Sequence, residues 1–172
     1  MTILHQVKHY ADHAHQGQYR KYTGDPYIIH PIEVAKRAAE FFKGTDFKYK
    51  TEIVSAAYLH DVVEDTPIQI EEISKLFGDQ VAKYVWFLTK PPGFTGNRAE
   101  RKELDRARLS LAPPEVRVVK YFDIQHNSES IKIYDTSFYK VFYSETSELL
   151  EAMKVLDIDF SGKQLEDYRN WL

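Results

Sequence analysis

Four residues at the end of an apolar helical run have the types and spacing that metal chemistry requires. His60 and Asp61 close the run Ile53–Leu59. Glu64 and Asp65 follow one helical turn later, on the same side of the helix. A buried imidazole or carboxylate is costly without a partner, and clustered carboxylates repel one another unless a cation lies among them. We therefore interpret His60 and Asp61 as half of a metal site, with Glu64 and Asp65 as a pair of catalytic acids beside it.

A metal needs further ligands, and two residues distant in sequence are candidates. His30 precedes a proline that suits a helix start, so it lies where a loop meets a helix. Asp123 interrupts an apolar helical stripe, where an unpaired carboxylate is uncommon. Taken singly, His30 is also typical of a hydrogen-bonded loop residue, and Asp123 of an ion pair with Lys120 or Arg117. Together with His60 and Asp61 they form a mixed nitrogen and oxygen set that suits Mn, Fe or Zn better than Ca or Mg.

Helical periodicity accounts for the elements that must position these residues. We expect helices at residues 3–16, 32–42, 49–64, 68–77, 80–89, 98–111, 114–127 and 138–155, with a short closing helix after residue 162. Residues 90–97 have the composition of a loop, and residues 128–137 are ambiguous. Strand patterns are scarce. The sequence therefore predicts an all-α fold, with residues 1–172 forming a single domain.

Composition excludes several classes of function. The 172 residues include no Cys, which removes thiolate catalysis and fits a reducing compartment. A formal net charge of −3 argues against nucleic-acid binding. No apolar run approaches the ~18 residues of a membrane span, and the N-terminal residues lack a signal-peptide pattern. We expect a soluble, cytoplasmic protein with no membrane or nucleic-acid partner.

Two other clusters have plainer interpretations. His5, His9 and His13 repeat at a spacing that can hold Zn, but no carboxylate lies in register, so we interpret them as a solvated helix face. The aromatic residues of 138–143 could stack a purine, but core packing explains them as well.

The order of the four ligand candidates resembles that of the HD superfamily of metal-dependent phosphohydrolases. The resemblance is closer to one branch, the hydrolase domain of the RelA/SpoT family, which degrades the alarmone (p)ppGpp. It is carried by residues 14–20 (AHQGQYR), 24–31 (GDPYIIHP), 56–66 (AAYLHDVVEDT) and 118–127 (VVKYFDIQHN). The length is like that of the small members of this branch that have only a hydrolase domain, and we expect no synthetase domain.

The resemblance implies roles for these residues. His30, His60, Asp61 and Asp123 would bind one Mn²⁺ ion, and Glu64 and Asp65 would position and activate the attacking water. Contacts to the substrate ppGpp or pppGpp would come from the set Arg20, Lys21, Arg98, Asn127 and Lys140. The reaction implied is removal of the 3′-pyrophosphate to leave GDP or GTP. A solvated helix face remains the alternative interpretation of Arg98 and Lys140.

Some positions depart from the family pattern and leave the substrate open. Ile124 replaces a basic residue, and Tyr121 and Phe122 replace a smaller pair, so the nucleoside pocket differs in shape. The same chemistry on ppApp or NADPH is therefore an alternative. A third hypothesis is a non-catalytic module that binds nucleotide, although such a module has no need of Glu64 beside Asp65. The oligomeric state is left open.

Overall fold

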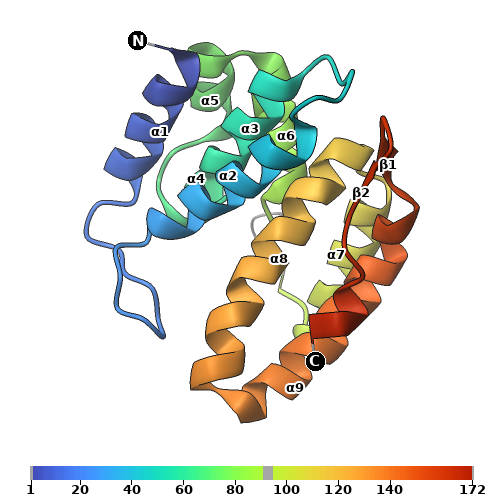
Figure 1. Ribbon diagram of the computed structural model, residues 1–172. Coiled ribbons are helices and arrows are strands. Elements are labelled where there is room, and N and C mark those ends of the chain that lie inside the picture. The colour runs from blue at the N-terminus through green and yellow to red at the C-terminus, as the bar shows by residue number, and fades with distance from the viewer. Residues whose placement is uncertain (1, 91–94, 172) are drawn as a thin grey trace.

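The computed structural model describes residues 2–90 and 95–171, and most of these residues are helical (Figure 1). The helices are α1 (Ile3–Ala14), α2 (Ile29–Phe42), α3 (Lys50–Leu59), α4 (Val62–Asp65), α5 (Ile70–Phe77), α6 (Asp79–Leu88), α7 (Arg98–Ser110), α8 (Pro114–Tyr134) and α9 (Thr136–Ala152). Two short strands, β1 (Asp159–Phe160) and β2 (Lys163–Gln164), pair as an antiparallel hairpin near the C-terminus. The predicted all-α fold is confirmed.

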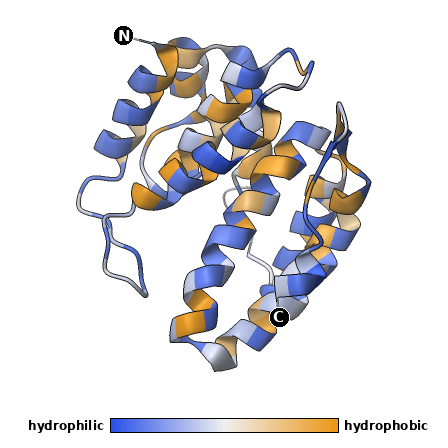
Figure 2. Cartoon of the chain, viewed as in Figure 1, coloured by the Kyte–Doolittle hydropathy of each residue, from blue (hydrophilic) through white to orange (hydrophobic). Residues whose placement is uncertain are grey.

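Helix α3 lies at the centre because its sequence is apolar on nearly every side. Residues Ile53–Ala57 are buried without a break, and Ala56 and Ala57 have no exposed surface. Such small side chains let neighbouring helices approach closely, and α3 packs against α1, α2, α6 and α8. Figure 2 shows the hydrophobic colouring concentrated on these inner helices, while the outward side of α1 is hydrophilic. The end of α3 is thereby held in the interior, next to α2 and α8.

Helix α8 crosses the molecule and connects two groups of helices (Figure 1). It packs against α2 and α3 on one side and against α9, which returns along it, on the other. Helix α7 in turn packs against α9. A residue in the middle of α8 can therefore face the end of α3 and the start of α2.

Two predicted helices were wrong in extent. The central helix does not run through to Glu64: it ends at Leu59, and a separate turn, α4, begins after Asp61, where φ is −101°. The ambiguous segment is helical, since α8 continues to Tyr134. The predicted closing helix is present as a short 3₁₀ helix, η2 (Tyr168–Trp171). A hairpin that the sequence did not predict precedes it, and in its tight turn Ser161 and Gly162 adopt left-handed backbone angles, with φ of 56° and 82°. The predicted loop at 90–97 falls partly outside the described residues.

Among the helices of the described ranges, none combines the length and hydropathy needed to cross a bilayer.

Candidate metal centre

The structure brings the four candidate ligands together. The Nε2 atoms of His30 and His60 are 3.2 Å apart. Asp61 Oδ2 lies 3.0 Å from His60 Nε2 and 3.7 Å from His30 Nε2. Asp123 Oδ1 lies 3.1 Å from His30 Nε2 and 3.7 Å from His60 Nε2. Donors about 2.1 Å from one shared ion are separated by about 3.0–3.5 Å, so the spacing of each carboxylate oxygen from the two imidazoles is close to that of a metal site. The ligand atoms of His30, His60 and Asp61 all lie within 4.8 Å of one another, and Asp123 approaches this group through the two imidazoles.

Each ligand comes from a different structural position. His30 lies in the first turn of α2, His60 caps the end of α3, Asp61 precedes α4, and Asp123 lies in the middle of α8. His30, His60 and Asp123 are buried, and the side chain of Asp61 retains 18% of its exposure. His60 and Asp61 are the two residues between α3 and α4. A metal ion held by these four residues would be surrounded by buried side chains, and solvent would reach it on the side of Asp61, which is partly exposed.

A backbone contact fixes the orientation of the His60 ring. Its Nδ1–H donates to the carbonyl oxygen of Ala57 at 2.8 Å. Because a carbonyl only accepts, the hydrogen is on Nδ1, and in the neutral ring Nε2 presents a lone pair to the other ligands. His30 is held differently, by a 2.7 Å contact between its Nδ1 and Nδ1 of His126.

The charges of this centre call for a cation. Burial lowers the pKa of His60, but Asp61 and Asp123 outweigh it and the pKa rises well above the ordinary value. Burial raises the pKa of Asp123, but Lys120 and the two imidazoles bring it well below its usual range. At His30 the effect of burial outweighs that of Asp123, and the pKa of the imidazole is lowered. Without metal the two carboxylates thus hold a proton on His60, in the place that a metal ion would fill.

Two further side chains bind the ligand carboxylates, and the sequence did not single them out as site residues. The Lys120 ammonium lies 2.7 Å from Asp123 Oδ2, and Asp123 raises its pKa despite the opposing effect of burial. The Tyr27 hydroxyl donates to Asp61 Oδ2 at 2.6 Å. The i,i+3 spacing of Lys120 and Asp123 was a signal for the first contact. Nothing in the spacing of Tyr27 and Asp61 predicts the second.

The two acids on α4 lie at the surface beside the centre. Glu64 is held by Lys90, whose ammonium is 2.5 Å from Oε1 and whose backbone N–H donates to Oε2 at 3.3 Å. The carbonyl of Asp65 accepts from Gln18 Nε2 at 3.0 Å. Burial, followed by the charges of Asp61 and Glu64, raises the pKa of Asp65. A carboxylate with a raised pKa is a stronger base than an ordinary one.

Of the predicted substrate contacts, Arg20 and Asn127 are connected to the centre. Arg20 Nη2 donates to Asn127 Oδ1 at 2.9 Å, and Asn127 Nδ2 donates to Asp123 Oδ1 at 2.8 Å. The guanidinium also lies 5.9 Å from the ring centre of Tyr27. Lys21 is exposed and contacts its neighbour, Tyr22. The amide of Asn127 therefore bridges a surface arginine and a ligand carboxylate.

Arg98 and Lys140, the other two predicted substrate contacts, do not lie beside the four candidate ligands. Arg98, at the start of α7, forms a two-point ion pair with Glu145 at 2.6 and 2.9 Å. Lys140 is exposed on α9. The α7 and α9 pair that carries both packs against the side of α8 away from α2.

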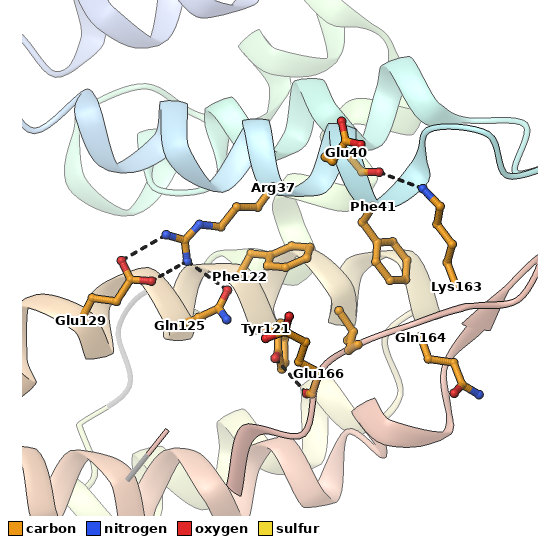
Figure 3. Close-up of a pocket in the computed structure, with 11 residues that line it drawn as sticks. Arg37, Glu40, Phe41, Tyr121, Phe122, Gln125, Glu129, Lys163, Gln164 and Glu166 are labelled. Carbon is orange, nitrogen blue, oxygen red and sulfur yellow. Dashed lines mark hydrogen bonds and ion pairs between the residues drawn. The ribbon is translucent and has the colours of Figure 1, made fainter. Parts of the chain in front are cut away.

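Two alternatives from the sequence can also be located. His5 and His9 are exposed, with their Nε2 atoms 3.1 Å apart, as on a solvated helix face. Tyr139 is buried in the core rather than presented to solvent. A separate cavity of about 530 Å³ lies between α2, α8 and the C-terminal hairpin, with Arg37 paired to Glu129 at one end (Figure 3). None of the four ligand candidates lines that cavity.

The comparisons with known proteins point to one family. The sequence model described as the HD domain matches residues 8–109. The chain is 35% identical over 158 residues to a guanosine-3′,5′-bis(diphosphate) 3′-pyrophosphohydrolase of Aquifex aeolicus (strain VF5), covering 83% of this chain and 22% of that protein. It is 35% identical over 132 residues to the bifunctional (p)ppGpp synthase/hydrolase SpoT of Escherichia coli (strain K12), covering 74% of this chain and 18% of SpoT. The chain therefore spans about a fifth of the length of these relatives.

Solved structures have the same fold. A structure described as a metazoan ortholog of SpoT that hydrolyzes ppGpp superposes with a TM-score of 0.78 at 23% identity, covering 94% of this chain and 86% of the other. The protein lmo0812 of Listeria monocytogenes EGD-e superposes with a TM-score of 0.61 at 28% identity, covering 78% and 84%. With its family match over more than half its length, this chain belongs to the HD domain family.

Proposed function

We propose that this protein is a metal-dependent hydrolase that removes the 3′-pyrophosphate of ppGpp or pppGpp. The observation that supports this most is that one oxygen of Asp61 and one of Asp123 each lie within 3.0–3.7 Å of the Nε2 atoms of both His30 and His60, which are themselves 3.2 Å apart, beside a pair of acids. The hydrolase names of relatives that match this region of the chain support the choice of substrate. In this proposal His30, His60, Asp61 and Asp123 hold the metal, and we infer Mn²⁺ from the mixed donor set and the family resemblance.

The chemistry divides between the metal and the chain. A divalent ion held by His30, His60, Asp61 and Asp123 would lower the pKa of a bound water molecule and polarise a phosphoryl oxygen. Asp65, with its raised pKa, accepts a proton as the water oxygen attacks phosphorus. Glu64, held by Lys90, orients that water. The bond between phosphorus and the 3′ oxygen breaks, and the 3′ oxygen takes up the proton that Asp65 accepted from the water, which leaves a free hydroxyl and pyrophosphate and restores the carboxylate.

Positively charged side chains near the centre would neutralise the negative charge of the substrate phosphates. Arg20 is half-buried and reaches the centre through Asn127, and Lys21 is exposed next to it. We propose that both lie along the nucleotide, with Asn127 contacting it directly. Arg98 and Lys140 lie further along the surface, where we propose that they contact the phosphates or the ribose.

Product analysis tests the proposal. The purified chain is incubated with MnCl₂ and, separately, ppGpp, pppGpp, ppApp and NADPH, and released pyrophosphate and phosphate are quantified by ion chromatography. We expect pyrophosphate from ppGpp and pppGpp, and a loss of at least about 100-fold in Asp61→Ala because a ligand is removed.

The matched control is Asp12→Ala, which removes a carboxylate exposed on α1 and should leave turnover unchanged. Turnover of ppGpp that survives Asp61→Ala would overturn the metal site. Turnover restricted to ppApp or NADPH would overturn the substrate. Tight nucleotide binding without turnover at saturating Mn²⁺ would identify a binding module instead.

A further inference from the structure

We propose that His126 is a positioning residue for the metal centre. It accepts the Nδ1–H of His30 and so turns the Nε2 lone pair of His30 toward the metal. The inference rests on the metal site of the proposed function but not on the identity of the substrate. His126 lies on α8, one helical turn after Asp123, and His30 lies on α2. The contact therefore joins the two helices that carry these ligands.

The contact between the rings has the geometry of a hydrogen bond. The Nδ1 atoms of His30 and His126 are 2.7 Å apart, which is shorter than the roughly 3.5 Å at which unbonded ring atoms stack. The two ring planes are inclined by only 19°, and their centres are 5.0 Å apart. The imidazoles thus meet edge to edge, nearly in one plane, with a hydrogen between the facing nitrogens.

The direction of this bond follows from what the other nitrogen of His30 must do. His30 Nε2 lies 3.1 Å from Asp123 Oδ1 and 3.2 Å from His60 Nε2, where the ligand atoms converge. An imidazole that binds a metal through Nε2 carries its hydrogen on Nδ1. His126 Nδ1 must then be the acceptor. If His126 donated instead, the hydrogen of His30 would be on Nε2 and would point at the metal.

His30 has the greatest need of such an acceptor. The corresponding nitrogen of His60 is satisfied by the carbonyl of Ala57, within its own helix. His30 is in the first turn of α2, and the carbonyl three residues before it, that of Tyr27, already accepts the backbone N–H of His30 at 2.9 Å. The acceptor is supplied by a side chain from α8. Outer partners of this kind set ligand orientation, and their loss typically weakens metal binding by about 10–100-fold.

The test measures metal affinity rather than turnover. Mn²⁺ and Zn²⁺ are titrated by calorimetry into the full chain and into His126→Phe and His126→Asn. Phenylalanine keeps the ring and removes the acceptor, whereas the Asn Oδ1 takes the place of Nδ1 and still accepts. We expect about 10–100-fold weaker binding in His126→Phe and near-normal binding in His126→Asn. The control is His13→Phe on the exposed face of α1, which should bind normally.

A second readout separates positioning from general damage to the fold. Nitrogen-15 NMR of the Zn²⁺-loaded chain should show His30 protonated at Nδ1, and His126→Phe should shift that signal while circular dichroism is unchanged. Equal affinity in all variants, or equal weakening in His126→Phe and His126→Asn, would overturn this inference alone. Failure of the unsubstituted chain to bind either metal would overturn the proposed function as well.

Discussion

The two oxygens of Asp123 have separate tasks. Oδ1 faces the imidazole of His30 and accepts from Asn127, and Oδ2 pairs with Lys120 at 2.7 Å. The lysine is largely enclosed, with 19% of its side chain exposed. It supplies a fixed positive charge beside a buried carboxylate, which leaves the other oxygen available to a metal. Asp123 can therefore be ionised before any metal binds.

Replacing Lys120 by a neutral residue tests whether the two oxygens of Asp123 have separate roles. We expect Lys120→Met to lower the free energy of unfolding of the metal-free chain by about 3 kcal/mol, because a buried carboxylate loses its partner. Urea denaturation in EDTA measures the change, and saturating Mn²⁺ should recover part of the loss. Lys140→Met, at an exposed position of α9, should stay within about 0.5 kcal/mol of the parent chain. Equal effects of the two substitutions would contradict the role given to Lys120.

At this scale the sequence indicated the buried residues that converge better than it indicated their partners. His30, His60, Asp61 and Asp123 could be chosen because a buried imidazole or carboxylate is unusual in its own right. His126 and Tyr27 could not, since their contacts join helices or loops far apart in the chain. Residue type and local spacing do not define such contacts, because the first depends on how α2 packs against α8 and the second on how the loop before α2 lies against Asp61.

Among the elements, the break between α3 and α4 matters most to the centre. His60 and Asp61, two of the four candidate ligands, are the residues between the last residue of α3 and the first of α4. The turn α4 has only four residues, and side chains of residues outside it donate hydrogen bonds to its backbone. The hydroxyl of Thr66 donates to the carbonyl of Val62 at 2.7 Å, and Gln18 donates to the carbonyl of Asp65 at 3.0 Å. The acid pair is thus positioned by contacts beyond its own helix.

Gln18 offers a test of that positioning. Gln18→Met keeps the length of the side chain and removes its hydrogen bond to Asp65. We expect kcat/KM for ppGpp to fall about tenfold while the affinity for Mn²⁺ is unchanged, because the acids shift and the ligands do not. Steady-state kinetics and calorimetry measure the two quantities, with Gln6→Met on exposed α1 as control. A parallel loss of metal affinity would contradict this account.

The end of α8 and the C-terminal hairpin could not be predicted from sequence patterns. Helix α8 extends to Tyr134 through a polar segment with no clear period, because Ile131 is buried in the folded chain and Ser128 and Ser130 donate to carbonyls one turn back. The hairpin near the C-terminus depends on two left-handed residues, Ser161 and Gly162. A glycine signals a turn but does not distinguish a hairpin from a helix start.

Considered as a whole, the described part of the molecule places the candidate metal centre apart from the cavity between α2, α8 and the C-terminal hairpin. The proposed catalytic region lies where α2, the end of α3 and α8 meet. The cavity of about 530 Å³ lies on another face of α8, lined by Phe41, Phe122 and the ion pair of Arg37 with Glu129 (Figure 3). The family match and the all-α fold support the function proposed for the catalytic region. That residues 1–172 form one domain stays a prediction.

Diffraction at the manganese absorption edge, from crystals grown with MnCl₂, tests the central claim most directly. We predict one strong anomalous peak about 2.1 Å from Nε2 of His30 and of His60 and close to a carboxylate oxygen of both Asp61 and Asp123. The peak should be absent from crystals of Asp61→Ala. A peak bound elsewhere, or one at this place that leaves Asp123 uncoordinated, would contradict the account.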